Sequence, residues 1–302
     1  MTRTIVVGYD GTDHGDDALA LGRQLAGMLA GRLVVACAYP DDPLGESAAA
    51  HEVTEGLRGD AQAKLERARA WLDGGAEPAG GVELRAVAGG SPSQVLHELA
   101  EELGADAIVV GATHHGRALR LLAGSTPDAV LNHAPCPVAV APDGYRDALH
   151  GTGGVRQVAV AYDGSPEARH ALEVAVGYAR AAGARLRLVT AVNSAAAGIY
   201  PPPPLDVASY EELGRIARDE ARAALDEVIA GLGPDVRADS AVLDGDVVTV
   251  LAEDAKTDDL LFTGSRAKGP FRRVLLGSVS THLLRDAACP VVVVPRGSGE
   301  DA

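Results

Sequence analysis

The chain has 302 residues, of which 47% are hydrophobic and only 3% aromatic, and its formal net charge is −15. This length allows two domains with buried cores, and the composition excludes a disordered or fibrous protein. The acidic charge argues against a nucleic-acid partner. Because apolar runs stay well below the roughly 20 residues of a membrane span, and the first apolar run is too short for a signal peptide, we expect a cytoplasmic protein.

Short apolar runs alternate with longer amphipathic segments along the first half of the chain. The apolar runs predict strands at 3–8, 32–38, 82–88, 106–111 and 137–141. The helical patterns lie between them, near 14–30, 55–73, 91–103 and 124–134. Strands that consist almost entirely of Val, Ile and Leu predict an α/β fold with a parallel sheet covered by helices on both faces. In such sheets, ligands bind beyond the carboxyl ends of the strands, where the winding reverses direction.

The second half repeats the first at a distance of 153 residues. IVVGYDGT (5–12) recurs as VAVAYDGS (158–165), and GATHHGRALRLLAGS (111–125) recurs as GSRAKGPFRRVLLGS (264–278). The windows 111–142 and 264–295 are identical at 13 of 32 positions. We expect one offset to hold over the whole length, which predicts a duplicated unit. The polar, glycine-rich stretch between the copies predicts domains at 1–143 and 155–298, joined by a linker at 144–154.

The loop 264–278 combines three glycines with four cations and contains no acidic residue. Its cations are Arg266, Lys268, Arg272 and Arg273, and a helix is predicted to begin near Ser278. Unpaired amides at a helix start bind phosphate, and the cations can offset three or four negative charges, which fits a nucleotide triphosphate. The alternative interpretation is a set of solvated surface cations beside turn glycines. The first loop holds only Arg117 and Arg120, so we expect the second half to bind ATP more tightly.

Asp10 and Asp163 follow the first strand of each copy and are therefore expected beside the same crevice. A carboxylate at this place can accept hydrogen bonds from ribose hydroxyls or join the shell of a Mg²⁺ ion bound to ATP. The structural alternative is that each aspartate caps the helix that follows it.

The pattern of a glycine, two residues, a small residue, nine residues and Gly-Ser, followed by a helix and a Pro-Val-Val-Val strand, resembles the universal stress protein family. The match covers both halves, as in the tandem form of that family. The resemblance implies two tandem five-stranded parallel sheets in the order 3-2-1-4-5, a Rossmann-like fold of the adenine nucleotide alpha hydrolase type. It also implies binding of ATP, AMP or ADP, and pairing of the two domains through their last strands within one chain, with a further homodimer left open.

The resemblance and the loop chemistry together assign a set of residues to ATP. In the first copy they are Gly8, Asp10, Ala38, Gly111, Arg117, Gly124, Ser125 and Thr126. In the second copy they are Ala161, Asp163, Ala191, Gly264, Arg266, Lys268, Gly269, Gly277, Ser278, Val279 and Ser280. The sequence departs from the family pattern at His114 and Ala267, which replace the second glycine of the loop and are expected to weaken binding about tenfold.

Three functions follow from these observations. The first is an ATP-binding regulator in the stress response with little or no catalytic turnover. The second is a slow ATPase or phosphotransferase, and the third is an interaction scaffold that no longer binds nucleotide. The sequence lacks the GxxxxGK[ST], GxSxG and HExxH motifs, which favours binding over turnover. Three cysteines without CxxC spacing, Cys37, Cys136 and Cys289, predict buried reduced thiols.

Overall fold

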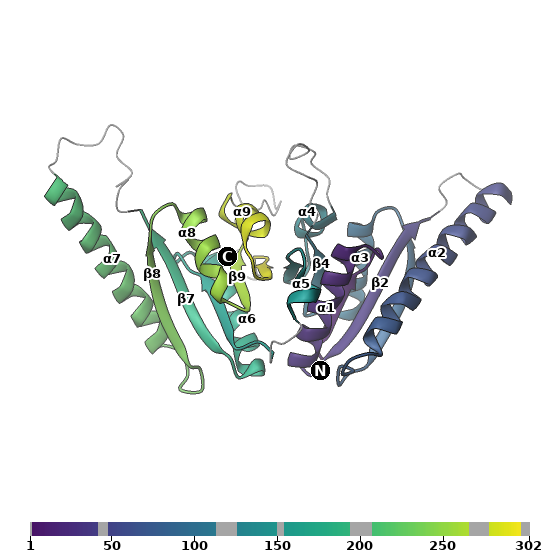
Figure 1. The fold of residues 1–302 in the computed structure, drawn as a ribbon, viewed down its shortest axis with the longest axis horizontal. Coiled ribbons are helices and arrows are strands. Elements are labelled where there is room, and N and C mark those ends of the chain that lie inside the picture. The colour runs from purple at the N-terminus through teal and green to yellow at the C-terminus, as the bar shows by residue number, and fades with distance from the viewer. Residues whose placement is uncertain are drawn as a thin grey trace, which may run out of the picture. The chain divides into compact units, whose positions relative to one another are not determined.

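The computed structural model describes residues 2–41, 48–112, 126–149, 154–193, 207–265 and 278–296. The chain divides into two compact units, and the boundary lies between Gly154 and Val155. Each unit contains its own parallel sheet with helices packed against it (Figure 1). No helix within the described ranges is long and apolar enough to cross a membrane.

The first unit alternates strands and helices in the predicted order. Its strands are β1 (Thr4–Gly8), β2 (Arg32–Pro40), β3 (Val82–Gly89), β4 (Ala107–Gly111) and β5 (Val138–Ala141). Its helices are α1 (Asp13–Met28), α2 (Ala48–Leu72), α3 (Pro92–Leu103), α4 (Thr126–Leu131) and α5 (Tyr145–Ala148). All strands are parallel, and they are arranged in the order β3-β2-β1-β4-β5. The predicted order 3-2-1-4-5 is therefore confirmed.

The second unit has the same architecture. Its strands are β6 (Gln157–Ala161), β7 (Arg185–Val192), β8 (Ala238–Asp244), β9 (Leu260–Gly264) and β10 (Val291–Val294). Its helices are α6 (Pro166–Ala182), α7 (Val207–Ala230), α8 (Val247–Asp254), the short 3₁₀ turn η1 (Ala255–Thr257) and α9 (Ser278–Asp286). The strands are parallel in the order β8-β7-β6-β9-β10, which matches the first unit strand for strand.

Side chains on β1 show how the sheet is covered on both faces. A Cβ atom at Gly22 of α1 would meet Val7, whereas one at Gly8 would meet Leu96 of α3. Successive residues of a strand point to opposite faces, so α1 and α3 lie on opposite faces of the sheet. Ile5, Val6 and Val7 are completely buried between them. The predicted coverage of both faces is thus confirmed.

The expectation of one constant offset is wrong in one interval. Leu33 pairs with Val82 in the first unit, and its equivalent Leu186 pairs with Ala238 rather than with residue 235. The offset is therefore 156 at β8, and it returns to 153 at β9, where Leu260 corresponds to Ala107. The connection that leads to β8 is three residues longer than the one that leads to β3, and the connection from β8 to β9 is three residues shorter than the one from β3 to β4. Neither difference affects the register of the central strands.

The segment predicted as a linker contains the short helix α5, which packs against α1. The carboxylate of Asp17 accepts hydrogen bonds from the backbone amides of Gly144 (2.9 Å) and Arg146 (2.8 Å). The residues immediately after β5 are therefore fastened to the first unit.

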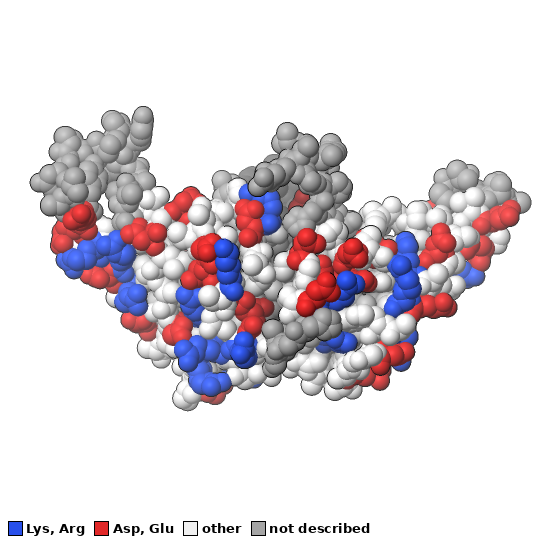
Figure 2. Space-filling model, in the orientation of Figure 1, with Lys and Arg blue, Asp and Glu red and all other residues white. Residues whose placement is uncertain are grey.

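Acidic and basic side chains are interspersed over the described surface that faces the viewer in Figure 2. On α7, for example, Arg215 pairs with Glu212 and Asp219, and Arg218 pairs with Asp244. Exposed pairs of this kind contribute little to stability and mainly keep the surface charges mixed.

Candidate functional site

The carboxyl edge of each sheet brings the predicted first-strand residues together. Gly8 ends β1 beside Ala36 of β2, and the amide of Tyr9 donates a 2.9 Å hydrogen bond to the carbonyl of Ala36. Ala38 lies two residues further along β2, and Gly111 ends β4 on the other side of β1. Gly8, Ala38 and Gly111 therefore surround the loop that carries Asp10, at the place where the winding of the sheet reverses.

Asp10 and Asp163 occupy the same turn in both units. The Oδ1 atom of Asp10 accepts hydrogen bonds from the amide (3.0 Å) and the hydroxyl (2.6 Å) of Thr12. The Oδ1 atom of Asp163 accepts from the amide of Ser165 at 3.0 Å. Each aspartate is followed by a glycine with a φ of +76°, a left-handed conformation that glycine adopts without strain. Both carboxylates are exposed at the carboxyl edge.

Thr12 and Ser165, rather than the aspartates, cap the helices that follow. The side chain of Thr12 accepts from the amide of Gly15, and that of Ser165 accepts from the amide of Ala168, both at 3.2 Å. Within the described residues, the hydrogen bonds of Asp10 involve only Oδ1, which leaves its Oδ2 atom available for a ligand.

The predicted loop glycines Gly111 and Gly264 contact the first turn of a helix. A Cβ atom on Gly111 would lie 2.0 Å from the carbonyl oxygen of His14 in α1. A Cβ atom on Gly264 would lie 2.6 Å from the carbonyl oxygen of Glu167 in α6. Close packing of helix on strand thus requires glycine at these positions, independently of any ligand.

The remaining predicted residues of the second unit lie at the same edge of their sheet. Ala161 ends β6, Ala191 lies near the end of β7 opposite Leu243, and Val279 is partly exposed in the first turn of α9. Ser280 is buried, and its hydroxyl donates a hydrogen bond of 3.2 Å to the carbonyl of Gly264. This bond joins α9 to the end of β9.

Several predicted residues lie outside the described ranges. They are Arg117, Gly124, Ser125, Arg266, Lys268, Gly269 and Gly277, together with the departures His114 and Ala267. Thr126 and Ser278 begin α4 and α9. The contacts of the two glycine-rich loops therefore remain predictions from the sequence.

A buried tyrosine connects the Asp10 loop to the segment after β5. The hydroxyl of Tyr9 donates to Asp16 at 2.9 Å, and the guanidinium of Arg146 donates to the other carboxylate oxygen of Asp16 at 2.6 Å. Burial, and secondly the hydrogen bond to Asp16, raise the pKa of Tyr9 to about 12, so the phenol keeps its proton at neutral pH.

Two cations of α2 were missed by sequence reasoning. Arg67 donates a 2.6 Å hydrogen bond to the carbonyl of Gly11, and the side chain of Lys64 lies against the same glycine. Burial raises the pKa of Cys37, and Lys64 acts in the opposite direction, which places this ammonium within electrostatic reach of the end of β2. The sequence shows only that Lys64 and Arg67 flank an apolar stripe; the tertiary packing of α2 brings them to the loop.

One group of potential metal ligands occurs within the described ranges, and it does not contain Asp10. Ligand atoms of His14, Asp17 and Asp143 lie within 4.8 Å of one another. Asp17 already accepts from two backbone amides, and the Nδ1 atom of His14 lies 3.6 Å from a carboxylate oxygen of Asp143. Their contacts fasten the chain after β5 to α1.

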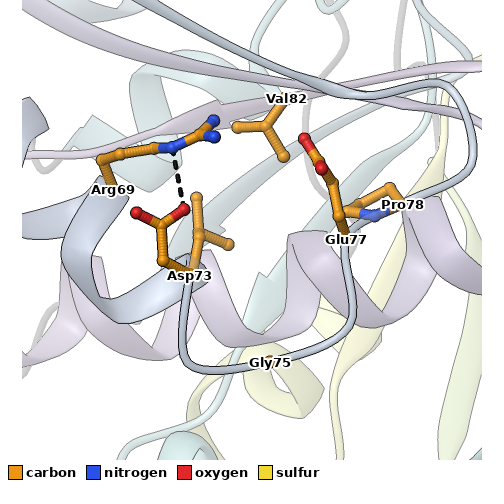
Figure 3. A pocket seen from close by; sticks show the side chains of 7 residues that line it. Arg69, Asp73, Gly75, Glu77, Pro78 and Val82 are labelled. Atoms are coloured by element: carbon orange, nitrogen blue, oxygen red, sulfur yellow. Dashed lines mark ion pairs between the residues drawn. The ribbon is translucent and has the colours of Figure 1, made fainter.

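A small hollow of about 120 Å³ lies at the opposite, amino edge of the first sheet (Figure 3). It is lined by Arg69, Leu72, Asp73, Gly75, Glu77, Pro78 and Val82. The guanidinium of Arg69 pairs with Asp73 at 2.9 Å. Because β3 begins at Val82, this hollow is far from the carboxyl edge and has no part in the site around Asp10.

Two parallel sheets, each with a Tyr-Asp-Gly turn after its first strand, define a tandem α/β protein. Comparison with known proteins gives the family. The universal stress protein family model matches residues 1–142 and 154–295, so the chain belongs to the universal stress protein family and contains two copies of its domain.

Relatives and solved structures agree with this assignment. A universal stress protein of Mycobacterium tuberculosis (strain H37Rv) is 30% identical over 302 residues, which cover 97% of this chain and 99% of the relative. A universal stress protein of Thermus aquaticus is 32% identical and matches 46% of this chain but 98% of its own length. The crystal structure of a universal stress protein from Archaeoglobus fulgidus covers 98% of this chain and 97% of its own, with a TM-score of 0.63 at 20% identity.

A solved universal stress protein in complex with cAMP is 31% identical, covers 47% of this chain and 97% of its own, and has a TM-score of 0.39.

Proposed function

We propose that this chain is an ATP-binding universal stress protein that acts as a nucleotide-dependent regulator, with little or no catalytic turnover. The observation that carries the proposal is the repeated turn at the carboxyl edge, in which Asp10 and Asp163 are held by the same backbone geometry. A turn that recurs in two copies, with its carboxylate exposed at the switch point of the sheet, is suited to bind the same kind of ligand twice.

The roles within the proposed site follow from the family resemblance and from the chemistry of the residues. Asp10 and Asp163 accept hydrogen bonds from ribose hydroxyls, and the backbone near Ala38 and Ala191 meets the adenine. The glycine-rich loops that follow β4 and β9 hold the phosphates through their amides and cations. AMP and ADP would occupy the same position with fewer phosphate contacts.

Mg²⁺ fits the proposed site as a companion of the phosphates. Asp10 offers one carboxylate oxygen that the turn does not use, and Mg²⁺ is usually held by one or two carboxylates together with phosphate oxygens and water. When bound, the ion would offset phosphate charge. The protein's own contribution is to hold the Asp10 turn rigid through Thr12.

A regulator requires binding without rapid turnover. In the turns that follow β1 and β6, the Oδ1 atoms of Asp10 and Asp163 are engaged in hydrogen bonds within the turn. A slow ATPase or a scaffold without nucleotide would be distinguished by two measurements on the full chain.

The first measurement is a thermal-shift titration with ATP. Binding to the native state adds about 2.7 kcal/mol of stability at a hundredfold excess over Kd, so we expect the melting temperature to rise with ATP concentration. The absence of any shift at millimolar ATP would favour the scaffold. The second is steady-state phosphate release, for which we expect less than one turnover per minute; rapid turnover that disappears in Asp163→Asn would favour the ATPase.

The family resemblance also suggests how the units assemble. We propose that β5 and β10, each the last strand of its sheet, pair within one chain, and that a homodimer of chains is a further option. Their sequences, PVAVAP and PVVVVP, are short and apolar, as in strands that are covered by another chain segment. Since a single-domain relative matches one half, separately produced halves can be tested by sedimentation, and two strictly monomeric halves would contradict the pairing.

The three cysteines are free thiols and buried in the structure. This state fits a reducing compartment, and a cytoplasmic location remains part of the proposal.

A further inference from the structure

Two cations of α2 lie over the turn that carries Asp10. The Nη2 atom of Arg67 is 2.6 Å from the carbonyl oxygen of Gly11. The Cγ and Cδ atoms of Lys64 would lie 3.0 and 3.4 Å from a Cβ atom placed on Gly11. Lys64 and Arg67 are three residues apart on one helix, so their side chains project from neighbouring positions toward the same loop.

Among the residues that the structure describes, these two cations have no acidic partner, unlike other cations of the same helix. Arg58 pairs with Glu55 and Arg69 pairs with Asp73. Arg67 bonds only to a backbone carbonyl, and no ion pair of Lys64 occurs within the described part of the chain. In a protein of net charge −15, two neighbouring cations without carboxylate partners at the candidate site are suited to receive an anionic group.

The position of α2 indicates which part of a bound nucleotide would carry the anionic group that Lys64 and Arg67 receive. The helix packs on β2 and β3, and Figure 1 shows it running along β2 and past its carboxyl end. The glycine-rich loop instead begins after β4, on the other side of β1. In the proposed binding mode the 5′-phosphates extend toward β4, so the cations of α2 face the ribose from the opposite side.

A carboxylate beside the ribose favours free hydroxyls, whereas a nearby arginine accommodates a phosphate on the ribose. The first unit has both, because Asp10 and Arg67 bind the same short turn. Two cations outweigh the single charge of Asp10 and leave a net positive charge for a phosphate monoester.

Over the ranges that are described, the second unit shows no equivalent of this feature. Gly164 has the same φ of +76° as Gly11, but no atom lies within 4 Å of a Cβ placed on it. The equivalent turn is therefore open on the side that α2 covers in the first unit.

We propose that the first unit selects adenine nucleotides that carry a phosphate on the 2′ or 3′ oxygen of the ribose, through Lys64 and Arg67. The second unit accepts nucleotides with an unmodified ribose. This inference rests on the proposed nucleotide-binding function and assigns different ligands to the two units.

The test is hydrogen-exchange mass spectrometry of the full chain during titration with AMP, adenosine 2′,5′-bisphosphate and adenosine 3′,5′-bisphosphate. Protection of residues 9–15 reports on the first unit, and protection of residues 162–168 reports on the second. We expect one bisphosphate to protect the first unit at a concentration at least about tenfold lower than AMP, as charge-assisted hydrogen bonds would give. We expect no such preference in the second unit.

The double variant Lys64→Ala/Arg67→Ala should lose this preference. The matched control Arg58→Ala/Arg69→Ala removes the same charge from the same helix and should keep it. Equal protection of the first unit by AMP and both bisphosphates would overturn the inference. The inference would also be overturned if the Lys64→Ala/Arg67→Ala variant bound all three nucleotides more weakly by the same factor, because the role of Arg67 would then be only to position Gly11. If no nucleotide protects either unit, the proposed function fails as well.

Discussion

Gly111 lies directly beneath the first turn of α1, so that a Cβ atom at this position would be 2.0 Å from the carbonyl oxygen of His14. The equivalent distance from Gly264 to the carbonyl oxygen of Glu167 is 2.6 Å. These contacts join the end of β4 or β9 to the start of the helix that follows the Asp-bearing turn. The relationship fixes the position of each strand end relative to the first turn of the helix above it.

Substitution of these glycines should therefore destabilise the fold itself. We expect Gly111→Ala and Gly264→Ala to lower the free energy of unfolding by about 1–3 kcal/mol, with the larger loss at Gly111, because backbone has to move. Gly177→Ala is the control, because Gly177 is an exposed helix residue with no atom within 4 Å of its Cβ position. Alanine at this position should raise the free energy of unfolding by about 0.5–1 kcal/mol. Chemical denaturation of the three variants gives the comparison. Equal effects at Gly111 and Gly177 would refute the packing role.

Asp258 is a buried carboxylate of the second unit that the first unit lacks. Its side chain is 1% exposed and lies 3.6 Å from Arg187, which makes a bidentate pair with Asp254. The corresponding residues of the first unit are Val34 and Ala105. Burial raises the pKa of Asp258, although a hydrogen bond from Gln157 and the charge of Arg187 counteract it.

A raised carboxyl pKa means that the folded state binds the proton more tightly than the unfolded state does. The contribution of Asp258 to stability therefore declines as pH rises from the ordinary carboxyl pKa through the raised one. Asp258→Ala should remove this decline, so the variant gains stability relative to the native chain as pH increases. Calorimetry between pH 4 and 8 measures the difference, and parallel curves would contradict the assignment.

Arg187→Val should lose stability relative to the native chain as pH rises, because the substitution leaves the carboxylates of Asp254 and Asp258 without their cation. Removal of one partner of a buried pair costs about 3–5 kcal/mol. The loss should be smaller at pH 5 than at pH 8, since Asp258 can then take up a proton. A loss below 1 kcal/mol at pH 8 would show that water reaches these groups.

Asp17 should control the order of the segment after β5. Its carboxylate is 3% exposed and accepts from the amides of Gly144 and Arg146, and hydrogen bonds to a charged group contribute about 1.5–3 kcal/mol each. In Asp17→Ala we expect residues 144–149 to exchange their amide hydrogens at least about tenfold faster. The control is His170→Ala at the equivalent position of α6, which should leave this segment unchanged. Unaltered exchange in Asp17→Ala would mean that other contacts hold the segment.

The internal repeat made most of the fold predictable. IVVGYDGT and VAVAYDGS both became a buried strand, a tight turn and a capped helix, because local pattern and glycine chemistry specify all three. The offset failed at β8 and at the start of α8, whose N-cap Asp246 lies 155 residues after the N-cap Ser91 of α3. The start of α2 was predicted wrongly, although its end was not: the helix begins at Ala48 rather than near residue 55, because helix starts without a capping motif leave little trace in the sequence.

The site was less predictable than the fold. Asp10 and Asp163 were placed correctly at the carboxyl edge, since strand ends determine their position. Gly111 and Gly264 were interpreted as phosphate-loop residues, but their packing against α1 and α6 depends on tertiary contact that spacing does not show. For the same reason Lys64 and Arg67 were missed, although they change the expected balance of cations between the two units.

The most direct test of the account is the number of nucleotides bound per chain, measured by native mass spectrometry with saturating Mg-ATP. Asp10→Asn and Asp163→Asn keep an oxygen acceptor for the turn but remove the charge and one acceptor for ribose. We predict two nucleotides for the native chain, one for each single variant and none for the double variant. A native chain that binds no nucleotide, or a double variant that still binds two, would contradict the assignment of the site.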